Sequence, residues 1–243
     1  MSEPELLPLG PDGVLVRFSG RLSEPANRAA LAFRAALERA APEGVVETAT
    51  SLTSVYLRFR PDILRRATLE DEMQGLLGDR DWLESDLPEG RRLWRVPASF
   101  GGAFGPDLEA SAEAAGVSAE VAVDEICGAR LRVLALGFAP GQPYLGFLPP
   151  HWDIPRQSDV TPEVPRGAVV VAVRQVIPFA NAAPTGWRQV GRTAFRCHDP
   201  AAEVPLPLRA GDEMQFEAVS ASDLQNLLNE GTALGGARSE PLP

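Results

Sequence analysis

The sequence of 243 residues contains no lysine, so that all 23 basic side chains are arginine. This absence excludes Schiff-base chemistry and a Walker-type phosphate loop, because each depends on a lysine amine. Positive charge is also in the minority: 33 acidic side chains give a formal net charge of −10. Such a balance disfavours nucleic acid as a partner, since little would offset the repulsion from its phosphates.

Cysteine is nearly absent, with only Cys127 and Cys197. The two lie far apart and lack metal-ligand spacing, so we predict neither a disulfide framework nor a metal site and read both as small buried side chains. No run of about twenty apolar residues occurs, and no basic segment followed by an apolar core opens the chain. We therefore predict a cytoplasmic protein that does not enter a membrane.

The remaining composition is that of a folded protein, with 44% hydrophobic and 23% charged residues. A chain of this length can bury two modest cores. The acidic stretch 81–90 ends in Pro-Glu-Gly and is typical of a domain boundary. We predict an α+β protein with an N-terminal domain over residues 1–88, a β-barrel domain over 89–220, and a short helix with a flexible tail over 221–243.

The first domain alternates short apolar runs with segments of helical periodicity. This order of elements predicts a ferredoxin-like α+β sandwich. It carries no cluster of catalytic residue types, so we expect a structural or partner-binding role. The predicted strands are 6–9, 14–18, 45–48 and 54–59, and the predicted helices are 24–39 and 62–77.

The second domain has many apolar runs separated by turn signals, which indicates a closed or nearly closed β-barrel. Asp107 precedes a helical segment and is predicted to cap it. The predicted strands include 92–97, 131–136, 168–173, 194–197 and 214–219, and the predicted helices are 108–115, 118–127 and 221–229.

A stretch rich in proline and glycine, residues 137–150, follows the apolar run 131–136. Its three glycines and four prolines predict a rigid, irregular loop. One interpretation is a preformed pocket wall, with Tyr144 and free backbone amides as its polar groups. The alternative is a packed loop that covers one end of the barrel.

Two arginines follow prolines, in Pro155-Arg156 and in Pro165-Arg166-Gly167. Guanidinium groups beside rigid turns suit a carboxylate or a phosphate, although solvated loop arginines are the simpler reading of each pair. Gln175 follows the buried run 168–173, where the end of a strand commonly presents a polar group.

The segment Gly137-Phe138-x-Pro140-Gly141-x-Pro143-Tyr144-Leu145 resembles the signature Gly-Phe-x-Pro-Gly-Phe-x-Tyr-Leu of the allophanate hydrolase subunit 1 family. That family includes the B subunits of bacterial 5-oxoprolinase and the histidine-kinase inhibitor KipI. The resemblance extends over residues 6–219. Further matches are Gly101-Gly102-x-Phe104-Gly105-Pro106-Asp107-Leu108, Pro155-Arg156, Val164-Pro165-x-Gly167, Gln175 and Pro184-x-Gly186-Trp187-x-x-x-Gly191-Arg192-Thr193.

The resemblance implies a ferredoxin-like domain followed by a cyclophilin-like β-barrel. It also implies a complex with a related C-type barrel subunit and an A-type subunit, which together would open 5-oxoproline to glutamate at the expense of ATP. The barrel pocket would then handle a small amide or carboxylate, or its phosphorylated intermediate.

The chain departs from the family pattern at positions that bear on chemistry. Ser99 to Ala103 replace the usual Cys-Tyr-Gly-Gly-Glu, and Glu125 stands where a histidine is usual. If those residues act as acids or bases in the family, either Glu125 substitutes as the catalytic residue or the activity is lost. Arg156 and Arg192 are predicted to hold an anion, and the other predicted substrate contacts are Tyr144, Gln175, Gly141 and Pro143.

Two further functions stay open at this point. The chain could be a non-catalytic module that docks a histidine kinase, as KipI does, and the lost histidine and glutamate favour that reading. Prolyl isomerase activity would follow from the barrel resemblance alone, and no set of residues supports it.

Overall fold

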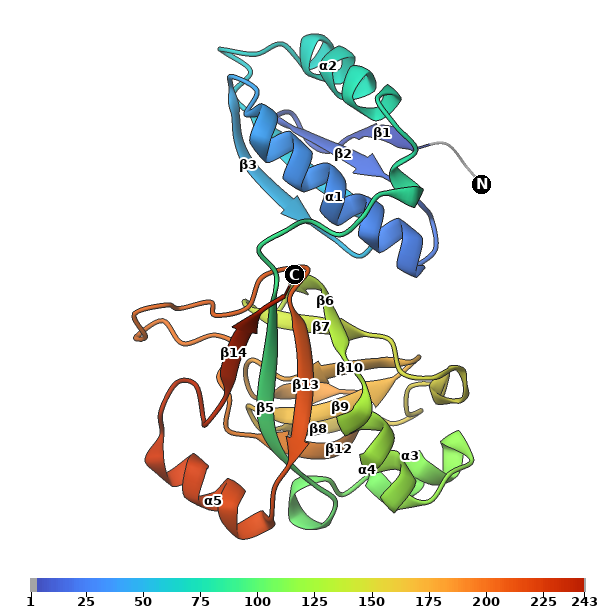
Figure 1. Cartoon of the computed structure of the whole chain (residues 1–243), viewed down its shortest axis with the longest axis vertical. Helices are drawn as coiled ribbons and strands as arrows, with labels where there is room; N and C mark the ends of the chain where they lie inside the picture. Colours follow the sequence, from blue (N-terminus) through green and yellow to red (C-terminus); the bar gives the residue numbers. More distant parts are fainter. Residues whose placement is uncertain (1–3, 243) are drawn as a thin grey trace. The chain divides into compact units, whose positions relative to one another are not determined.

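The computed structural model describes residues 4–242, which divide into two compact units (Figure 1). The first unit ends at Glu89 and the second begins at Gly90. Within the described residues, none of the helices has the length and apolar character needed to cross a membrane.

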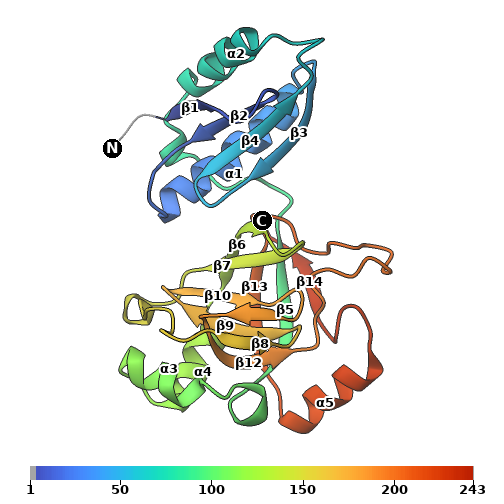
Figure 2. The same ribbon diagram turned by 180° about the vertical axis from the view of Figure 1, so that it is seen from behind.

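The first unit is a four-stranded antiparallel sheet with the order β1-β2-β4-β3. Helix α1 covers one face of the sheet, as Figures 1 and 2 both show. Strands β2 and β3 flank β4 and are joined through α1, which makes a split β-α-β unit. The elements are β1 (Glu5–Pro8), β2 (Gly13–Arg17), α1 (Glu24–Ala40), β3 (Val45–Thr50), β4 (Ser54–Phe59), α2 (Arg66–Gly78) and a 3-10 turn, η1 (Trp82–Glu84).

A local cap fixes the start of α1. The Ser23 hydroxyl accepts a hydrogen bond from the Ala26 N–H at 3.4 Å and caps the helix. The apolar positions, including Phe33 and Leu37, are fully buried against the sheet. Helix α2 begins later than the sequence predicts, at Arg66.

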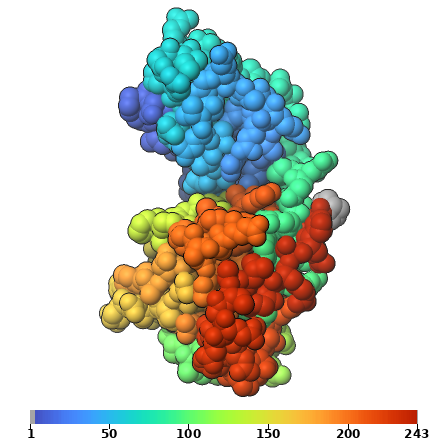
Figure 3. Space-filling model, turned by 90° about the vertical axis from the view of Figure 1, so that its left-hand side faces the viewer, coloured from blue at the N-terminus to red at the C-terminus, as the bar shows by residue number. Residues whose placement is uncertain are grey.

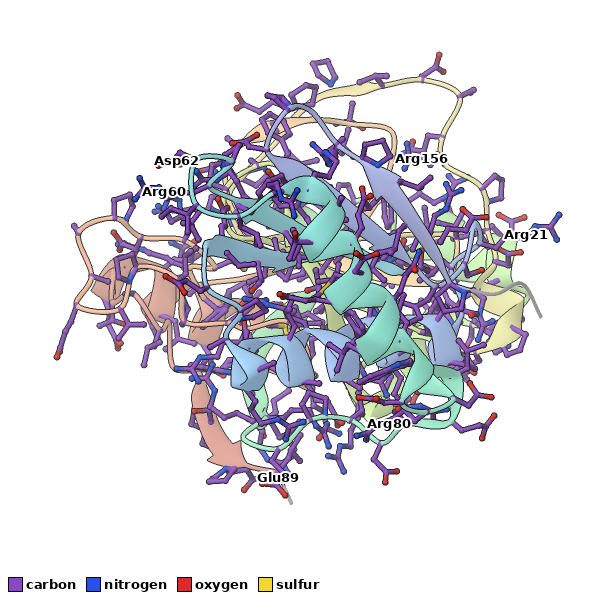
Figure 4. The ribbon with its side chains drawn as sticks, turned by 90° about the horizontal axis from the view of Figure 1, so that it is seen from above. Arg21, Arg60, Asp62, Arg80, Glu89 and Arg156 are labelled. Atoms are coloured by element: carbon purple, nitrogen blue, oxygen red, sulfur yellow. The ribbon has the colours of Figure 1, made fainter. Side chains whose placement is uncertain are left out.

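A turn replaces the predicted first residues of α2. Arg60 and Asp62 form an ion pair at 2.6 Å across it, and Figure 4 labels both residues. The Leu64 N–H donates to the carbonyl of Arg60, so the chain makes a separate turn before the helix starts.

The second unit is a closed β-barrel of seven strands, in the order β12-β9-β10-β7-β6-β13-β5, in which β12 also pairs with β5. Together with the sheet of the first unit, it confirms the predicted α+β class. The strands are β5 (Arg92–Phe100), β6 (Leu131–Gly137), β7 (Gln142–Gly146), β9 (Ala168–Ala172), β10 (Gln175–Pro178), β12 (Arg188–Thr193) and β13 (Glu213–Ala218).

The remaining elements surround the barrel. Strand β8 (Thr161–Val164) pairs with β11 (Ala183–Thr185), and β14 (Arg238–Pro241) pairs with β5. Figures 1 and 2 show α3 and α4 on one side of the barrel and α5 on the opposite side. These helices are α3 (Leu108–Ala115), α4 (Ala119–Gly128) and α5 (Ala221–Glu230), and the 3-10 turns are η2 (Gly102–Phe104) and η3 (Pro150–Trp152).

The barrel wall has two apolar faces, and β9 shows how they arise. Its residues are buried throughout and alternate between the two faces, as expected for a strand covered on both sides. Val169 and Val171 pack into the main core, which includes residues from all seven barrel strands. Ala168, Val170 and Ala172 face an outer cluster with Phe179 and Trp187.

Four predictions about this unit are wrong. The stretch 137–150 is not irregular throughout, because β7 lies within it. Residues 194–197 are not a strand, because β12 ends at Thr193. The tail is not free, since β14 pairs with β5. The Asp107 carboxylate does not cap α3 but accepts from the Gln189 N–H at 2.7 Å, which ties the start of the helix to β12.

Candidate functional site

Three side chains meet beside α4, and we call them the Glu125 triad: Glu125, His151 and Trp152. One carboxylate oxygen of Glu125, Oε2, accepts from the Trp152 indole at 2.6 Å and makes a hydrogen bond of 2.8 Å with His151 Nε2. The side chains of Glu125 and His151 are 25% and 39% exposed, whereas Trp152 is fully buried. The triad is thus anchored on its buried side and open on the histidine side.

Two segments bring the triad together. Ser118 caps α4 by accepting from the Val121 N–H at 3.2 Å, as the sequence predicts. Burial of Ala122 and Ile126 on the core side of α4 then leaves Glu125 at the margin of the barrel. The η3 turn after β7 supplies the other two members, and Figures 1 and 2 both show this segment beside α3 and α4.

The triad keeps Glu125 ionised. Partial burial opposes the charged form, but the hydrogen bonds from Trp152 and His151, together with the charge of a protonated His151, outweigh it. The pKa of Glu125 therefore lies below its ordinary value. A carboxylate in this state can orient an imidazole through a hydrogen bond.

The tight turn between β9 and β10 holds η3 in place. Its residues, Val173 and Arg174, both have positive φ, of 45° and 64°. The Arg174 N–H donates to the Trp152 carbonyl at 2.9 Å, and the Val173 N–H donates to the Ile154 carbonyl at 2.8 Å. The Arg174 Nε also donates to the Leu148 carbonyl at 2.9 Å. These bonds fix the backbone on which His151 sits.

Gln175 follows that turn directly and is 6% exposed. It lies opposite Gly146 and Ala172 in the register of the sheet. Its amide nitrogen, Nε2, is buried and has no hydrogen-bond partner among the described residues. A buried donor without an acceptor is costly in a folded protein. Among the predicted site residues, Gln175 is therefore the one whose buried side-chain N–H group lacks an acceptor within the described chain.

The β6–β7 hairpin contains three more of the predicted substrate contacts. Tyr144 lies on β7, and its hydroxyl donates to the Phe138 carbonyl at 2.9 Å. The hydroxyl proton is thus already used in a hydrogen bond within the hairpin. Gly141 has φ 74°, and a side chain there would meet Leu206 at 2.7 Å. Gly141 and Pro143 are buried. The conformation and packing of the hairpin account for these residues without a ligand.

The structure does not bring Arg156 and Arg192 together. The exposed Arg156 lies over the ring of Trp187 at 5.4 Å and is labelled in Figure 4. Trp187 directly precedes β12, whereas Arg192 is near its end, roughly 16 Å further along the strand. Arg192 also lies opposite Ala168, the first residue of β9. A single anion cannot bridge the two guanidinium groups in this arrangement.

Sequence reasoning missed His151. It is one of only two histidines in the chain, and it follows Pro149 and Pro150 in a rigid segment. Its rarity and its rigid surroundings could have marked His151 as a candidate site residue. Its contact with Glu125, 26 positions earlier, follows from the packing of α4 and gives no local pattern.

The cysteines are poor nucleophiles. Both are free, and burial raises the pKa of Cys127 to about 11 and that of Cys197 to about 12. Because the thiolate is the reactive form, neither residue offers a nucleophile near neutral pH.

Comparisons with known proteins place the chain in a family. Residues 4–208 match the model of the carboxyltransferase domain, subdomain C and D. The chain is 30% identical over 222 residues to the B subunit of 5-oxoprolinase from Bacillus subtilis (strain 168), and the match covers 88% of this chain and 92% of that protein.

Solved structures agree with the fold. A crystal structure of TTHA0988 matches with a TM-score of 0.71 and 33% identity, over 86% of this chain and 40% of that chain. This chain thus spans less than half of that protein. The urea amidolyase of K. lactis matches with a TM-score of 0.74 over 98% of this chain and 16% of its own, and at 16% identity it supports the fold alone.

Proposed function

This chain belongs to the carboxyltransferase domain family, subdomain C and D, with the B subunit of 5-oxoprolinase among its relatives, and from that premise we propose that it is the B-type component of a 5-oxoprolinase-type complex. C-type and A-type subunits would complete the complex, and ATP would be consumed as the lactam ring is opened. The substrate class is a small cyclic amide whose product is a carboxylate.

The observation that carries this proposal is the pairing of Glu125 with His151. By the resemblance described above, Glu125 stands where a histidine is usual, and His151 reaches Glu125 from another segment. A histidine and a carboxylate, the groups needed for acid–base work, therefore meet in a different arrangement. This favours the enzyme-subunit reading over a kinase-docking module without chemistry.

The geometry suggests a division of roles. Glu125 binds Nε2 of His151, which leaves Nδ1 without a partner among the described residues. Nδ1 would take a proton from an attacking water while the water oxygen bonds to the amide carbon. The same proton would then pass to the amide nitrogen as the C–N bond breaks. Glu125 would act as a positioning residue, which refines its predicted catalytic role.

Gln175 and Arg156 would contribute binding. The buried Nε2 of Gln175 would donate to a carbonyl oxygen, which would satisfy a donor that lacks an acceptor in the free chain. Arg156 lies outside the Glu125 triad in an exposed, irregular segment and would attract a carboxylate toward this side of the barrel.

Reconstitution with C-type and A-type subunits tests the proposal. We expect ATP hydrolysis that depends on 5-oxoproline, and a fall in kcat of about 10²-fold or more for His151→Gln, the usual loss when an acid–base group is removed. Glu125→Gln should lower kcat, because the imidazole of His151 loses the carboxylate that orients it.

Asp124→Asn is the matched control, since it removes a carboxylate one position earlier from the exposed side of α4. Its kcat should equal that of the unmodified chain. A complex that assembles but shows no 5-oxoproline-dependent ATP hydrolysis would refute the proposed activity. Unchanged kcat in His151→Gln would remove the role given to the Glu125 triad.

A further inference from the structure

Three arginines surround a small pocket on the side of the barrel next to α5, and we call it the arginine pocket. Its volume is about 60 Å³, room for one tetrahedral oxyanion or about two waters. Figure 3 views this side of the molecule, with α5 in red beside the orange segment that follows β12. The charged lining residues are Arg166, Arg192 and Arg196.

The arginine pocket is built from rigid backbone. Arg166 lies in the turn between β8 and β9, next to Gly167 with φ 80°. The Thr193 N–H donates to the Gly167 carbonyl at 2.8 Å, which presses this turn against β12. A side chain at position 167 would lie 2.1 Å from the Thr193 carbonyl oxygen, so only glycine permits the approach. Arg166 and Arg192 are therefore held as neighbours.

These two guanidinium groups have no carboxylate partner among the described residues. Arg192 Nε donates to the Arg166 backbone carbonyl at 3.3 Å, which leaves the other donors of its guanidinium group available. Burial lowers the pKa of Arg192, and the charge of Arg166 lowers it further. The pair thus concentrates positive charge in a chain whose net charge is −10.

Within the described residues, the charge of Arg196, unlike those of Arg166 and Arg192, is balanced by a carboxylate. Arg196 forms an ion pair with Asp199 at 2.7 Å, and this bond is the main cause that lowers the pKa of Asp199, with a smaller contribution from the charge of Arg166. Its Nη2 also lies 3.6 Å from where a side chain at Gly231 would begin, at the C-terminal end of α5, where backbone carbonyls carry partial negative charge. Three arginines and one aspartate leave a net charge of +2 around the pocket.

We propose that the arginine pocket binds a phosphate-type dianion, either inorganic phosphate or the phosphate group of a small ester. A phosphate dianion carries between about −1.5 and −2 at pH 7, which matches the net charge of the lining groups. Arginine is the side chain best suited to phosphate oxygens, because its planar fork can donate two parallel hydrogen bonds. The volume admits the phosphate itself, so an ester would project its organic part toward solvent.

This site is distinct from the Glu125 triad. The triad lies beside α4 and the arginine pocket lies beside α5, on the opposite side of the barrel in Figures 1 and 2. The inference does not depend on the proposed function, because phosphate binding requires neither partner subunits nor a lactam.

Titration calorimetry on the full chain at low ionic strength tests the inference, with inorganic phosphate, AMP and acetate as probes. We expect saturable binding of phosphate that is at least tenfold tighter than binding of acetate. Arg166→Gln and Arg192→Gln should each weaken phosphate binding by about tenfold, as expected for loss of a charged donor. Binding of AMP would identify an ester site, and binding of inorganic phosphate without AMP would identify a site for the free ion.

Arg130→Gln is the matched control, because it removes the same charge from a half-exposed arginine of the same unit, paired with Glu213. Its phosphate affinity should stay within twofold of the unmodified chain. If Arg130→Gln weakens phosphate binding as much as the pocket variants do, the effect comes from the overall charge and the site is refuted. Acetate binding as tight as phosphate binding, or no saturable phosphate binding, would also refute it. Thermal unfolding of each variant checks the fold, and the exposed Arg166 allows a substitution that leaves the core intact.

Discussion

At the scale of single residues, two buried glutamines of the barrel differ in whether their side-chain amides are hydrogen-bonded. Gln142 and Gln175 are each 6% exposed, but their hydrogen bonding differs. The side-chain oxygen of Gln142 accepts from the Ala180 N–H at 3.0 Å, whereas the side-chain nitrogen of Gln175 has no partner among the described residues. A buried polar group stabilises a fold only where its partner is present.

We expect Gln175→Met to stabilise the chain by about 1 kcal/mol, because it replaces an unsatisfied donor with an apolar group of similar size. Gln142→Met should destabilise the chain by a similar amount, because it leaves the Ala180 N–H unpaired. Urea denaturation of both variants measures the two free energies of unfolding. If Gln175→Met is as destabilising as Gln142→Met, the amide of Gln175 has a partner within the fold.

The lowered pKa of Glu125 makes stability depend on pH. The stabilisation is fully present above the pKa of an unfolded glutamate, about 4.3, and is lost as the pH falls through the lower folded value. The free energy of unfolding of Glu125→Gln should therefore change less between about pH 5 and pH 3 than that of the unmodified chain. Asp124→Asn, measured by the same denaturation series, should keep the original slope, and an equal slope in Glu125→Gln would contradict the triad.

Individual site residues were only partly predictable. The family resemblance indicated Glu125 and the end of a predicted strand indicated Gln175, and the structure gives both a specific environment. The pairing of Arg156 with Arg192 could not be tested from sequence, because their separation depends on the contact of Arg156 with Trp187, which lies just before β12. His151 was missed since its partner comes from a distant helix.

At the scale of elements, the turn between β9 and β10 has an unusual composition. Two residues with positive φ are typical of a type I′ hairpin, which favours asparagine and glycine. Val173 is β-branched and 42% exposed, so it accepts an unfavourable conformation and gains little from burial.

Val173→Asn should therefore stabilise the chain by about 1 kcal/mol, because asparagine adopts the left-handed region more readily. Val160→Asn is the control: this valine is 62% exposed and does not have positive φ. Its free energy of unfolding should change by less than about 0.5 kcal/mol. Thermal or urea denaturation compares the variants, and a loss of stability in Val173→Asn would contradict the strain argument.

Most elements were predictable because their periodicity is local. Helix α3 begins and ends at the predicted residues, and α1 extends the predicted segment by one residue. Strand β7 was hidden because its prolines and glycines predict a loop, yet pairing with β6 and β10 overrides that local preference. The role of Asp107 was likewise decided by a distant partner, Gln189.

At the scale of the whole molecule, each of the two units of the described chain has its own main hydrophobic core. The first includes Phe33 and Trp82, which pack edge-to-face at 5.0 Å. The second fills the barrel, and the exposed strand β14 pairs with β5 without contributing to that core. The acidic Pro/Gly segment indicated the division into units, and the repeated turn signals indicated a closed or nearly closed barrel, whereas the strand order, in which β12 pairs with β5, could not be predicted.

Because each unit has its own core, we expect each unit to fold by itself, and two fragments of the chain can test this. Residues 1–89 and 90–243 should each unfold cooperatively in urea, because each carries its own core and the larger one has the size of an ordinary domain. Trp82, 3% exposed, is the sole tryptophan of the first fragment and reports its unfolding by fluorescence. The fragment 90–243 should also retain the phosphate affinity of the full chain within twofold, since every residue of the arginine pocket belongs to it. A fragment 90–243 that unfolds without cooperativity would show that the barrel depends on the first 89 residues for its stability.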